Sequence, residues 1–199
     1  MEYTFPGVMQ GQSSLCYKRI SEISDKWNVF EWKIEMDDVV QGSLGDCYFL
    51  TAISALSNYP YLIREKFRTI EYNEIGYYEV ILFIDGEWQV VFIDDYFVFD
   101  IDTEDHKPAF AFSKPNGLEL WAVILEKAWA KVNGGYSLIV AGLIHEALKC
   151  SPSLHLKFFW INLVYQPFDE EGDVKETQSI PRMLHGLALL LSTSILRLL

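Results

Sequence analysis

The chain has 199 residues, of which 50% are hydrophobic and 15% aromatic. This composition suits one domain with a sizeable core, or one domain and a fragment, and it argues against disorder. The 16 basic and 28 acidic residues give a net charge of −12, and because no Lys/Arg cluster is present we expect no nucleic-acid partner. The acidity fits a soluble cytoplasmic protein and leaves carboxylates available for a divalent cation.

The three cysteines, Cys16, Cys47 and Cys150, are widely spaced and form no Cys-x-x-Cys pair. This spacing does not support a zinc knuckle, and the odd number argues against a disulfide framework. We therefore expect a reducing, cytoplasmic compartment. Residues 1–10 have neither a basic n-region nor an apolar h-region, so we expect no secretory signal there.

Residues 1–28 are weakly periodic and are expected to form an extended leader with a short helix. Residues 46–56 are predicted to be a helix because their apolar positions recur at helical spacing. These positions are Leu50, Ile53 and Leu56. The sequence SNYP at 57–60 ends the pattern, and a second short helix is expected around residues 62–67.

Two β-rich runs follow, YYEVILFI at 77–84 and EWQVVFID at 87–94. They flank Asp85-Gly86, and an Asp-Gly pair between strands predicts a hairpin because both residues tolerate the positive φ that the turn requires. Residues 97–116 carry proline punctuation and are expected to form a loop.

The clearest helix is predicted over residues 118–132, LELWAVILEKAWAKV, with a stop signal at 133–135, NGG. Its apolar stripe, which we expect to be core, contains Leu118, Trp121, Ala122, Leu125, Trp129 and Val132. Glu119 is expected in the first turn and Lys131 in the last, where each complements the helix dipole. These elements together indicate an α+β fold with one small antiparallel sheet.

Residues 184–199, LHGLALLLSTSILRLL, form an apolar run that is shorter than the ~20 residues of a membrane-spanning helix. We expect a buried strand or helix cut off before its partners, so truncation of the chain is an expectation. A tail anchor or an amphipathic surface helix remains the alternative, although a membrane partner is not expected.

Cys47 is the candidate nucleophile. It is predicted at a helix N-terminus, where unpaired N–H groups and partial positive charge favour the thiolate. Gly42 and Gly45 permit a tight turn ahead of it, and Asp46 suits the N-cap position. The amide of Gln41 would donate to an oxygen that develops negative charge on an attacked carbonyl. The alternative is a packing role for the thiol, because free cysteines are among the most buried residues.

The stretch QGSLGDCYFLTAISAL at 41–56 closely resembles the active-site segment of calpains, the calcium-dependent papain-like cysteine proteases. Three further blocks resemble calpain sequence in the same order: VFEWK at 29–33, GEWQVVFIDDYF at 86–97 and ELWAVILEKAWAKVNGGYSLIVAG at 119–142. The resemblance covers roughly residues 29–148. It implies a papain-like α+β fold, in which a helical subdomain with a central nucleophile helix accompanies a small antiparallel sheet.

The resemblance implies roles for four residues. Cys47 matches the nucleophile, and Gln41 matches the glutamine of the oxyanion hole. Asp38 and Glu119 match carboxylates that bind a structural calcium ion, a cation that takes about six to eight oxygen ligands. The alternative is that Asp38 is a solvated loop charge and Glu119 a helix-dipole partner.

A calpain also needs a histidine base and an asparagine, in Gly-His-Ala-Tyr and Asn-Pro-Trp contexts that this sequence lacks. The histidines are His106, His145, His155 and His185. His185 is the candidate base, since its spacing of 138 residues from Cys47 lies within the roughly 130–150 of papain-like enzymes. Its context, MLHGLALL, differs from the family's, and no asparagine follows Asn162.

We expect three parts: a leader at 1–28, a calpain-like first catalytic subdomain at 29–148, and a divergent or truncated remnant of a second subdomain at 149–199. The predicted function is a calcium-dependent cysteine endopeptidase of the cytoplasm that acts on protein substrates, with other calpain domains or subunits as further partners. Little turnover is expected from this chain alone. The alternative is a non-catalytic calpain-like module that binds partners or regulates an active relative.

Overall fold

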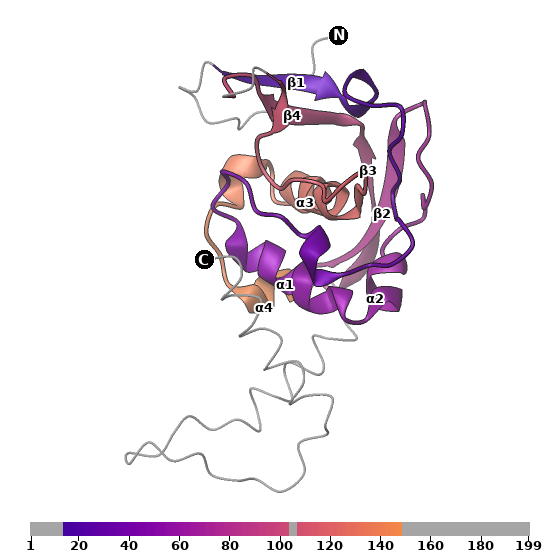
Figure 1. Cartoon of the computed structure of the whole chain (residues 1–199). Coiled ribbons are helices and arrows are strands. Elements are labelled where there is room, and N and C mark those ends of the chain that lie inside the picture. The colour runs from indigo at the N-terminus through magenta and orange to yellow at the C-terminus, as the bar shows by residue number, and fades with distance from the viewer. Residues whose placement is uncertain (1–13, 104–106, 149–199) are drawn as a thin grey trace, which may run out of the picture.

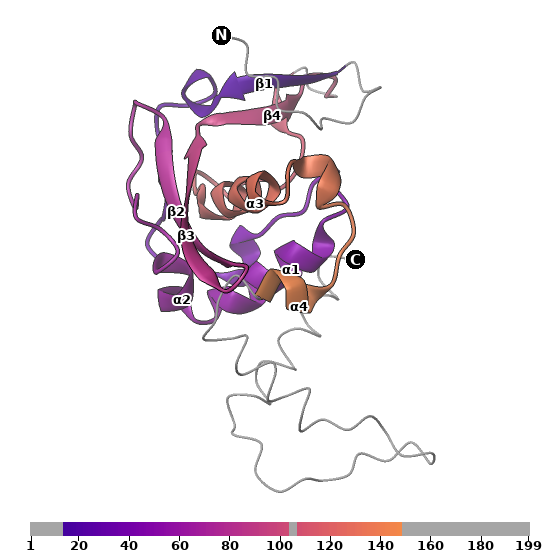
Figure 2. The ribbon, with the colours of Figure 1, turned by 180° about the vertical axis from the view of Figure 1, so that it is seen from behind.

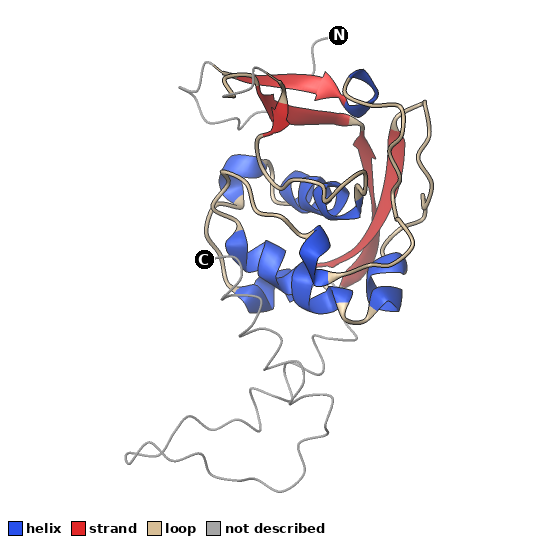
Figure 3. Cartoon of the chain, in the orientation of Figure 1, coloured by secondary structure: helices blue, strands red, loops and turns tan. Residues whose placement is uncertain are grey.

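The computed structural model describes residues 14–103 and 107–148. Its helices are α1 (Cys47–Ser57), α2 (Pro60–Arg64), α3 (Trp121–Val132) and α4 (Ile144–Leu148), with short 3-10 helices η1 (Ile20–Glu22), η2 (Met36–Asp38) and η3 (Tyr136–Leu138). Its strands are β1 (Leu15–Arg19), β2 (Tyr77–Ile84), β3 (Glu87–Asp94), β4 (Tyr96–Asp100) and β5 (Ala109–Phe110). The α+β class is therefore confirmed (Figure 3).

Helix α3 lies at the centre of the fold (Figure 1). The strands β1 and β4 lie across one side of it, the β2–β3 hairpin stands along another, and α1, α2 and α4 form a layer on the side opposite β1 and β4 (Figures 1 and 2). Helix α1 contacts α2, α3 and α4. The helix that begins at Cys47 is therefore held from several directions.

The strands form two antiparallel sheets, one of three strands in the order β1-β4-β5 and one made by β2 and β3. The hairpin prediction is confirmed, because β2 and β3 pair around Asp85 and Gly86, whose φ angles are 52° and 88°. The loop expected at 97–116 is wrong where β4 and β5 lie. Residues 97–99 of β4 are all buried, so the strand lacks the two-residue alternation that marks a half-buried strand.

Two helix boundaries differ from the expected ones. Helix α3 begins at Trp121 because the backbone of Asn28 pairs with the preceding segment, donating to the Leu118 carbonyl and accepting from the Leu120 N–H, at 2.9 Å each. Glu119 therefore lies ahead of the helix and not in its first turn. Helix α2 begins at Pro60, whose fixed φ suits the first helical position.

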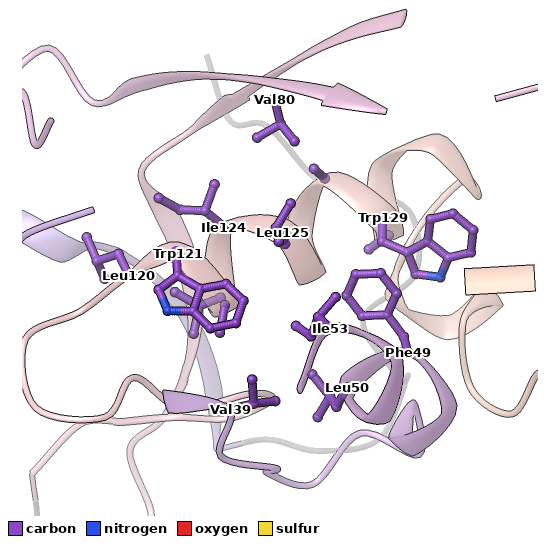
Figure 4. Packing of buried hydrophobic residues seen from close by; sticks show 14 of the residues in the cluster. Val39, Phe49, Leu50, Ile53, Val80, Leu120, Trp121, Ile124, Leu125 and Trp129 are labelled. Atoms are coloured by element: carbon purple, nitrogen blue, oxygen red, sulfur yellow. The ribbon is translucent and has the colours of Figure 1, made fainter. Parts of the chain in front are cut away.

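The core is centred on the contact between α1 and α3. Every residue of α1 after Cys47 is buried, and so are all but the last two residues of α3. The rings of Phe49 and Trp129 stack with centroids 5.4 Å apart, with Ile53 and Leu125 close by (Figure 4). Trp121, Ala122, Leu125 and Trp129 of the expected stripe thus lie in a helix that is buried on all sides over residues 121–130. The other two members, Leu118 and Val132, are only partly buried, and Leu118 lies ahead of α3.

Candidate active site

Cys47 is the first residue of α1, and its side chain is exposed. The Asp46 carbonyl accepts hydrogen bonds from the N–H groups of Phe49 and Leu50, at 2.8 and 3.2 Å, which starts the helix beside the sulfur. The polar N–H end of α1 is therefore next to an accessible thiol, as a thiolate nucleophile requires. A packing role for Cys47 does not fit this exposure.

The turn between Val40 and Cys47 is held by the segment that follows β5. The Lys114 N–H donates to the Val40 carbonyl at 2.8 Å. Both the N–H and the hydroxyl of Ser43 donate to the Ala111 carbonyl, at 3.0 and 2.6 Å. These bonds fix the conformation of the turn from one side.

Glycine is required within this turn, because Gly42 lies directly against the neighbouring backbone. A Cβ atom at position 42 would lie 1.6 Å from the Phe112 carbonyl oxygen. On the other side, the Gly45 carbonyl accepts a hydrogen bond from the Ala141 N–H at 2.9 Å. The turn is thus held between two parts of the chain that are far away in sequence.

Gln41 lies at the start of the turn and is half-buried. Its Nε2 donates to the Leu44 carbonyl at 3.5 Å, which is a long and therefore weak hydrogen bond. Its Oε1 is buried and has no hydrogen-bond partner among the described residues. The weak bond leaves the Nε2 donor available to a stronger acceptor such as an oxyanion.

Asp46 occupies the N-cap position, but its side chain makes no capping hydrogen bond, so the expected capping role is wrong. The carboxyl group is fully buried and contacts the carboxyl group of Glu126 on α3. Burial raises the pKa of Asp46 to about 6. Burial and then the charge of Asp46 raise the pKa of Glu126 well above its ordinary value.

Sequence reasoning missed Glu126. Its position carries a usable signal, because it lies four residues after Ala122 and three before Trp129 and so shares the apolar face of α3. A carboxylate on such a face must find a partner inside the protein. The structure supplies that partner from the N-terminus of α1.

The structure brings Asp38 and Glu119 together, and both are buried. Asp38 Oδ2 accepts the Glu35 N–H at 2.6 Å and the Trp121 Nε1–H at 3.4 Å, while Glu119 Oε1 accepts the Glu31 N–H at 2.9 Å. Burial raises the pKa of Glu119 to about 7, and the adjacent Asp38 adds to the rise. The alternatives of a solvated loop charge and a first-turn dipole partner are therefore wrong.

This pair fits part of a calcium site. Adjacent carboxylates are calcium ligands, and a cation between them would relieve their repulsion. In residues 14–103 and 107–148 no group of three or more His, Cys, Asp or Glu side chains could hold a metal ion. The other ligands would therefore be backbone carbonyls and water.

Several predicted features lie outside the described residues: His106, Cys150, His155, His185, the apolar run at 184–199 and the part expected at 149–199. The candidate base His185 therefore stays a prediction. His145, which the structure does describe, is exposed on α4. No helix in the part of the chain that the structure covers is long and apolar enough to cross a membrane.

A sequence model described as "Calpain family cysteine protease" matches residues 5–163. The chain is 43% identical over 126 residues to "Calpain-type cysteine protease ADL1" of Oryza sativa subsp. japonica and 42% identical over 120 residues to "Calpain-type cysteine protease DEK1" of Zea mays. It is 32% identical over 164 residues to "Calpain-2 catalytic subunit" of Mus musculus.

These alignments cover 63%, 60% and 73% of the chain, respectively. The chain in turn spans 6%, 5% and 22% of the length of these three relatives.

Proposed function

The chain belongs to the calpain family of cysteine proteases, and from that membership we propose that it carries the nucleophile-bearing part of an endopeptidase. The enzyme would cleave internal peptide bonds of protein substrates. The observation that carries the proposal is the exposed Cys47 at the N-terminus of α1, at the end of a fixed turn that begins with Gln41.

In the proposed reaction the Cys47 thiolate attacks the carbonyl carbon of the scissile peptide bond. Gln41 Nε2 and the Cys47 backbone N–H donate hydrogen bonds to the oxygen that becomes negative. The C–N bond then breaks, a histidine gives its proton to the leaving amine, and a thioester remains on Cys47. Water hydrolyses this thioester and restores the thiol.

The missing histidine motif limits the catalytic activity of this chain on its own. The sequence lacks the Gly-His-Ala-Tyr and Asn-Pro-Trp motifs in which calpains carry their base and asparagine. We therefore propose that the isolated chain turns over little peptide and that partner domains of the calpain type complete the enzyme. A non-catalytic module that binds or regulates a relative is the second candidate, and the same missing motifs favour it.

Calcium belongs to the same proposal. Asp38 and Glu119 would hold the ion, which would neutralise two buried carboxylates and join η2 to the start of α3. A cytoplasmic location is proposed as well, because the odd number and wide spacing of the cysteines favour a reducing compartment.

Peptide hydrolysis and thiol alkylation test the proposal together. We expect Cys47 to react with iodoacetamide faster than Cys16, which is only partly exposed. Mass spectrometry of the peptides that contain Cys47 and Cys16 measures both rates in one sample. Any peptide hydrolysis should disappear in Cys47→Ala and persist in Cys16→Ala.

Hydrolysis that survives Cys47→Ala would contradict a nucleophilic role. Equal alkylation of Cys47 and Cys16 would contradict the proposed accessibility of the site. Calcium-stimulated hydrolysis that needs Cys47 would support the enzyme and overturn the expectation of low turnover.

A further inference from the structure

The interior holds a pair of carboxyl groups that the proposed reaction does not use. Asp46 is 0% exposed and Glu126 is 2% exposed. Neither carboxylate oxygen of Asp46 accepts a hydrogen bond from an N–H or hydroxyl group of the described residues. The Asp46 carboxyl group instead lies next to the carboxyl group of Glu126.

Such a contact requires a proton. Two carboxylates this close in a low-dielectric interior do not both ionise near neutral pH. In the described part of the chain no lysine or arginine forms an ion pair with Asp46 or Glu126. A proton on Glu126 therefore supplies the donor that the buried Asp46 carboxylate lacks, and the raised pKa values of both groups agree with this.

Glu126 also contacts the segment after β5 that holds the turn between Val40 and Cys47. Its Oε1 accepts the Ser113 N–H at 2.9 Å, and Ser113 directly precedes Lys114, whose N–H donates to Val40. One side chain on α3 thus contacts Asp46, at one end of the turn, and Ser113, which precedes the residue that holds the other end. Asp46 lies at the end next to Cys47, and Ser113 lies beside the end next to Gln41.

We propose that Glu126 is a positioning residue for Cys47. In its protonated form, Glu126 bridges the carboxylate of Asp46 and the backbone of Ser113. This inference rests on the proposed function, because it concerns the same site. The bridge ties the N-terminus of α1 to the segment that fixes the preceding turn. Loss of the shared proton would place two repelling charges inside the core and loosen the position of the thiol.

The other titratable groups near the pair keep their protons at neutral pH. Tyr48 on α1 and Tyr136 on η3 face it. Burial is the largest cause that raises the pKa of each hydroxyl, and the charge of Asp46 is a smaller cause in the same direction. Cys47 follows Asp46 in the chain and is exposed. The carboxyl pair is therefore one source of pH dependence near neutrality, and Glu119, whose pKa burial raises to about 7, is another.

The first test measures how the midpoint of thermal unfolding changes with pH for the whole chain in calcium-free buffer. The wild-type midpoint should fall between about pH 5 and 8, because the folded pair retains protons that the unfolded chain has lost. Glu126→Gln should show a smaller fall, since its amide donates to Asp46 without titrating. The exposed Glu87→Gln is the matched control and should keep the wild-type slope.

The second test measures the pH profile of Cys47 alkylation by iodoacetamide, with Cys16 as the internal reference. Asp46→Asn removes a negative charge from the residue that precedes Cys47 in the chain, so the profile should move to lower pH. Glu126→Gln should leave the profile in place. Glu126→Leu, which cannot bridge, should lower the ratio of the Cys47 rate to the Cys16 rate by about threefold through the loss of alignment at the helix end.

If the midpoint of thermal unfolding changes equally with pH in wild type and Glu126→Gln, the proposal of a shared proton is wrong. An unmoved profile in Asp46→Asn would overturn the placement of the charge, and an unchanged rate ratio in folded Glu126→Leu would overturn the positioning role. Should Glu126→Leu not fold, the isosteric Gln and Asn variants still decide. None of these measurements needs peptide hydrolysis, so a failure of the proposed function is seen separately.

Discussion

The fold buries two pairs of carboxyl groups, and the hydrogen-bond donors around them differ. Asp38 and Glu119 accept N–H groups from the surrounding backbone and from Trp121. Asp46 accepts no such bond, and its carboxyl group depends on Glu126. The N–H donors around the first pair stabilise its negative charge, so this pair suits a cation. The second pair lacks such donors, and its carboxyl groups are hydrogen-bonded only while the pair keeps a proton.

The stabilisation of the chain by calcium should be the largest effect that distinguishes the two pairs. If the first pair binds the ion, calcium at 100 times its Kd should stabilise the chain by about 2.7 kcal/mol. Asp38→Asn should abolish this gain, and Asp46→Asn should keep it. Thermal unfolding with and without calcium measures the difference.

The exposed neighbour Asp37 provides a matched control, because Asp37→Asn removes the same charge beside the site and should keep the calcium response. A response that survives Asp38→Asn would remove the proposed calcium site. A response lost in Asp46→Asn would assign the ion to the second pair and reverse the comparison.

Removal of one carboxyl group from a pair should give the next largest effect on the free energy of unfolding. Glu126→Leu leaves the buried Asp46 carboxylate without a donor and should lower the free energy of unfolding by about 2 kcal/mol. Glu119→Leu leaves Asp38 with its N–H donors and removes a repulsion, so we expect a loss below about 1 kcal/mol. Urea unfolding in calcium-free buffer compares the two variants, and a greater loss in Glu119→Leu would contradict this account.

The pH dependence of the first pair gives a further test of the comparison. Because the pKa of Glu119 is raised from 4.5 to about 7, its contribution to stability is full below pH 4.5 and declines as pH rises to about 7. Glu119→Gln should remove this decline in calcium-free buffer. A decline of equal size in Glu119→Gln would show that other groups cause it.

Saturating calcium offers a second way to test the same group. The ion would hold Glu119 ionised in the folded chain, so its part of the decline should vanish when calcium is added to the wild type. The decline that belongs to Glu126 should remain. Persistence of the whole decline in calcium would place Glu119 outside the ion's reach.

Parts of the fold were predictable because their cause is local. The β2–β3 turn follows from Asp85 and Gly86, whose conformational freedom is a property of those two residues. The start of α1 at Cys47 follows from the glycine-containing turn and the apolar periodicity behind it. The placement of Cys47 and Gln41 in one turn likewise needs only their closeness in sequence, whereas their roles stay predictions.

Contacts between distant segments were not predictable in this way. The pairing of β1 with β4 joins residues 15–19 to 96–100, and neither segment shows the alternation typical of a strand with one buried face. The contact of Asp46 with Glu126 likewise joins the N-terminus of one helix to the middle of another. A capping role for Asp46 was the local expectation, and burial against α3 replaced it.

The sequence by itself determined the helix that begins at Cys47, the hairpin and the family, because local periodicity, turn residues and ordered motifs are written in consecutive positions. Only the tertiary structure decided which carboxyl groups meet, how each pair is satisfied and how the turn before Cys47 is held. Packing brings together residues that no local pattern connects, and the burial it imposes sets whether a carboxyl group keeps its proton.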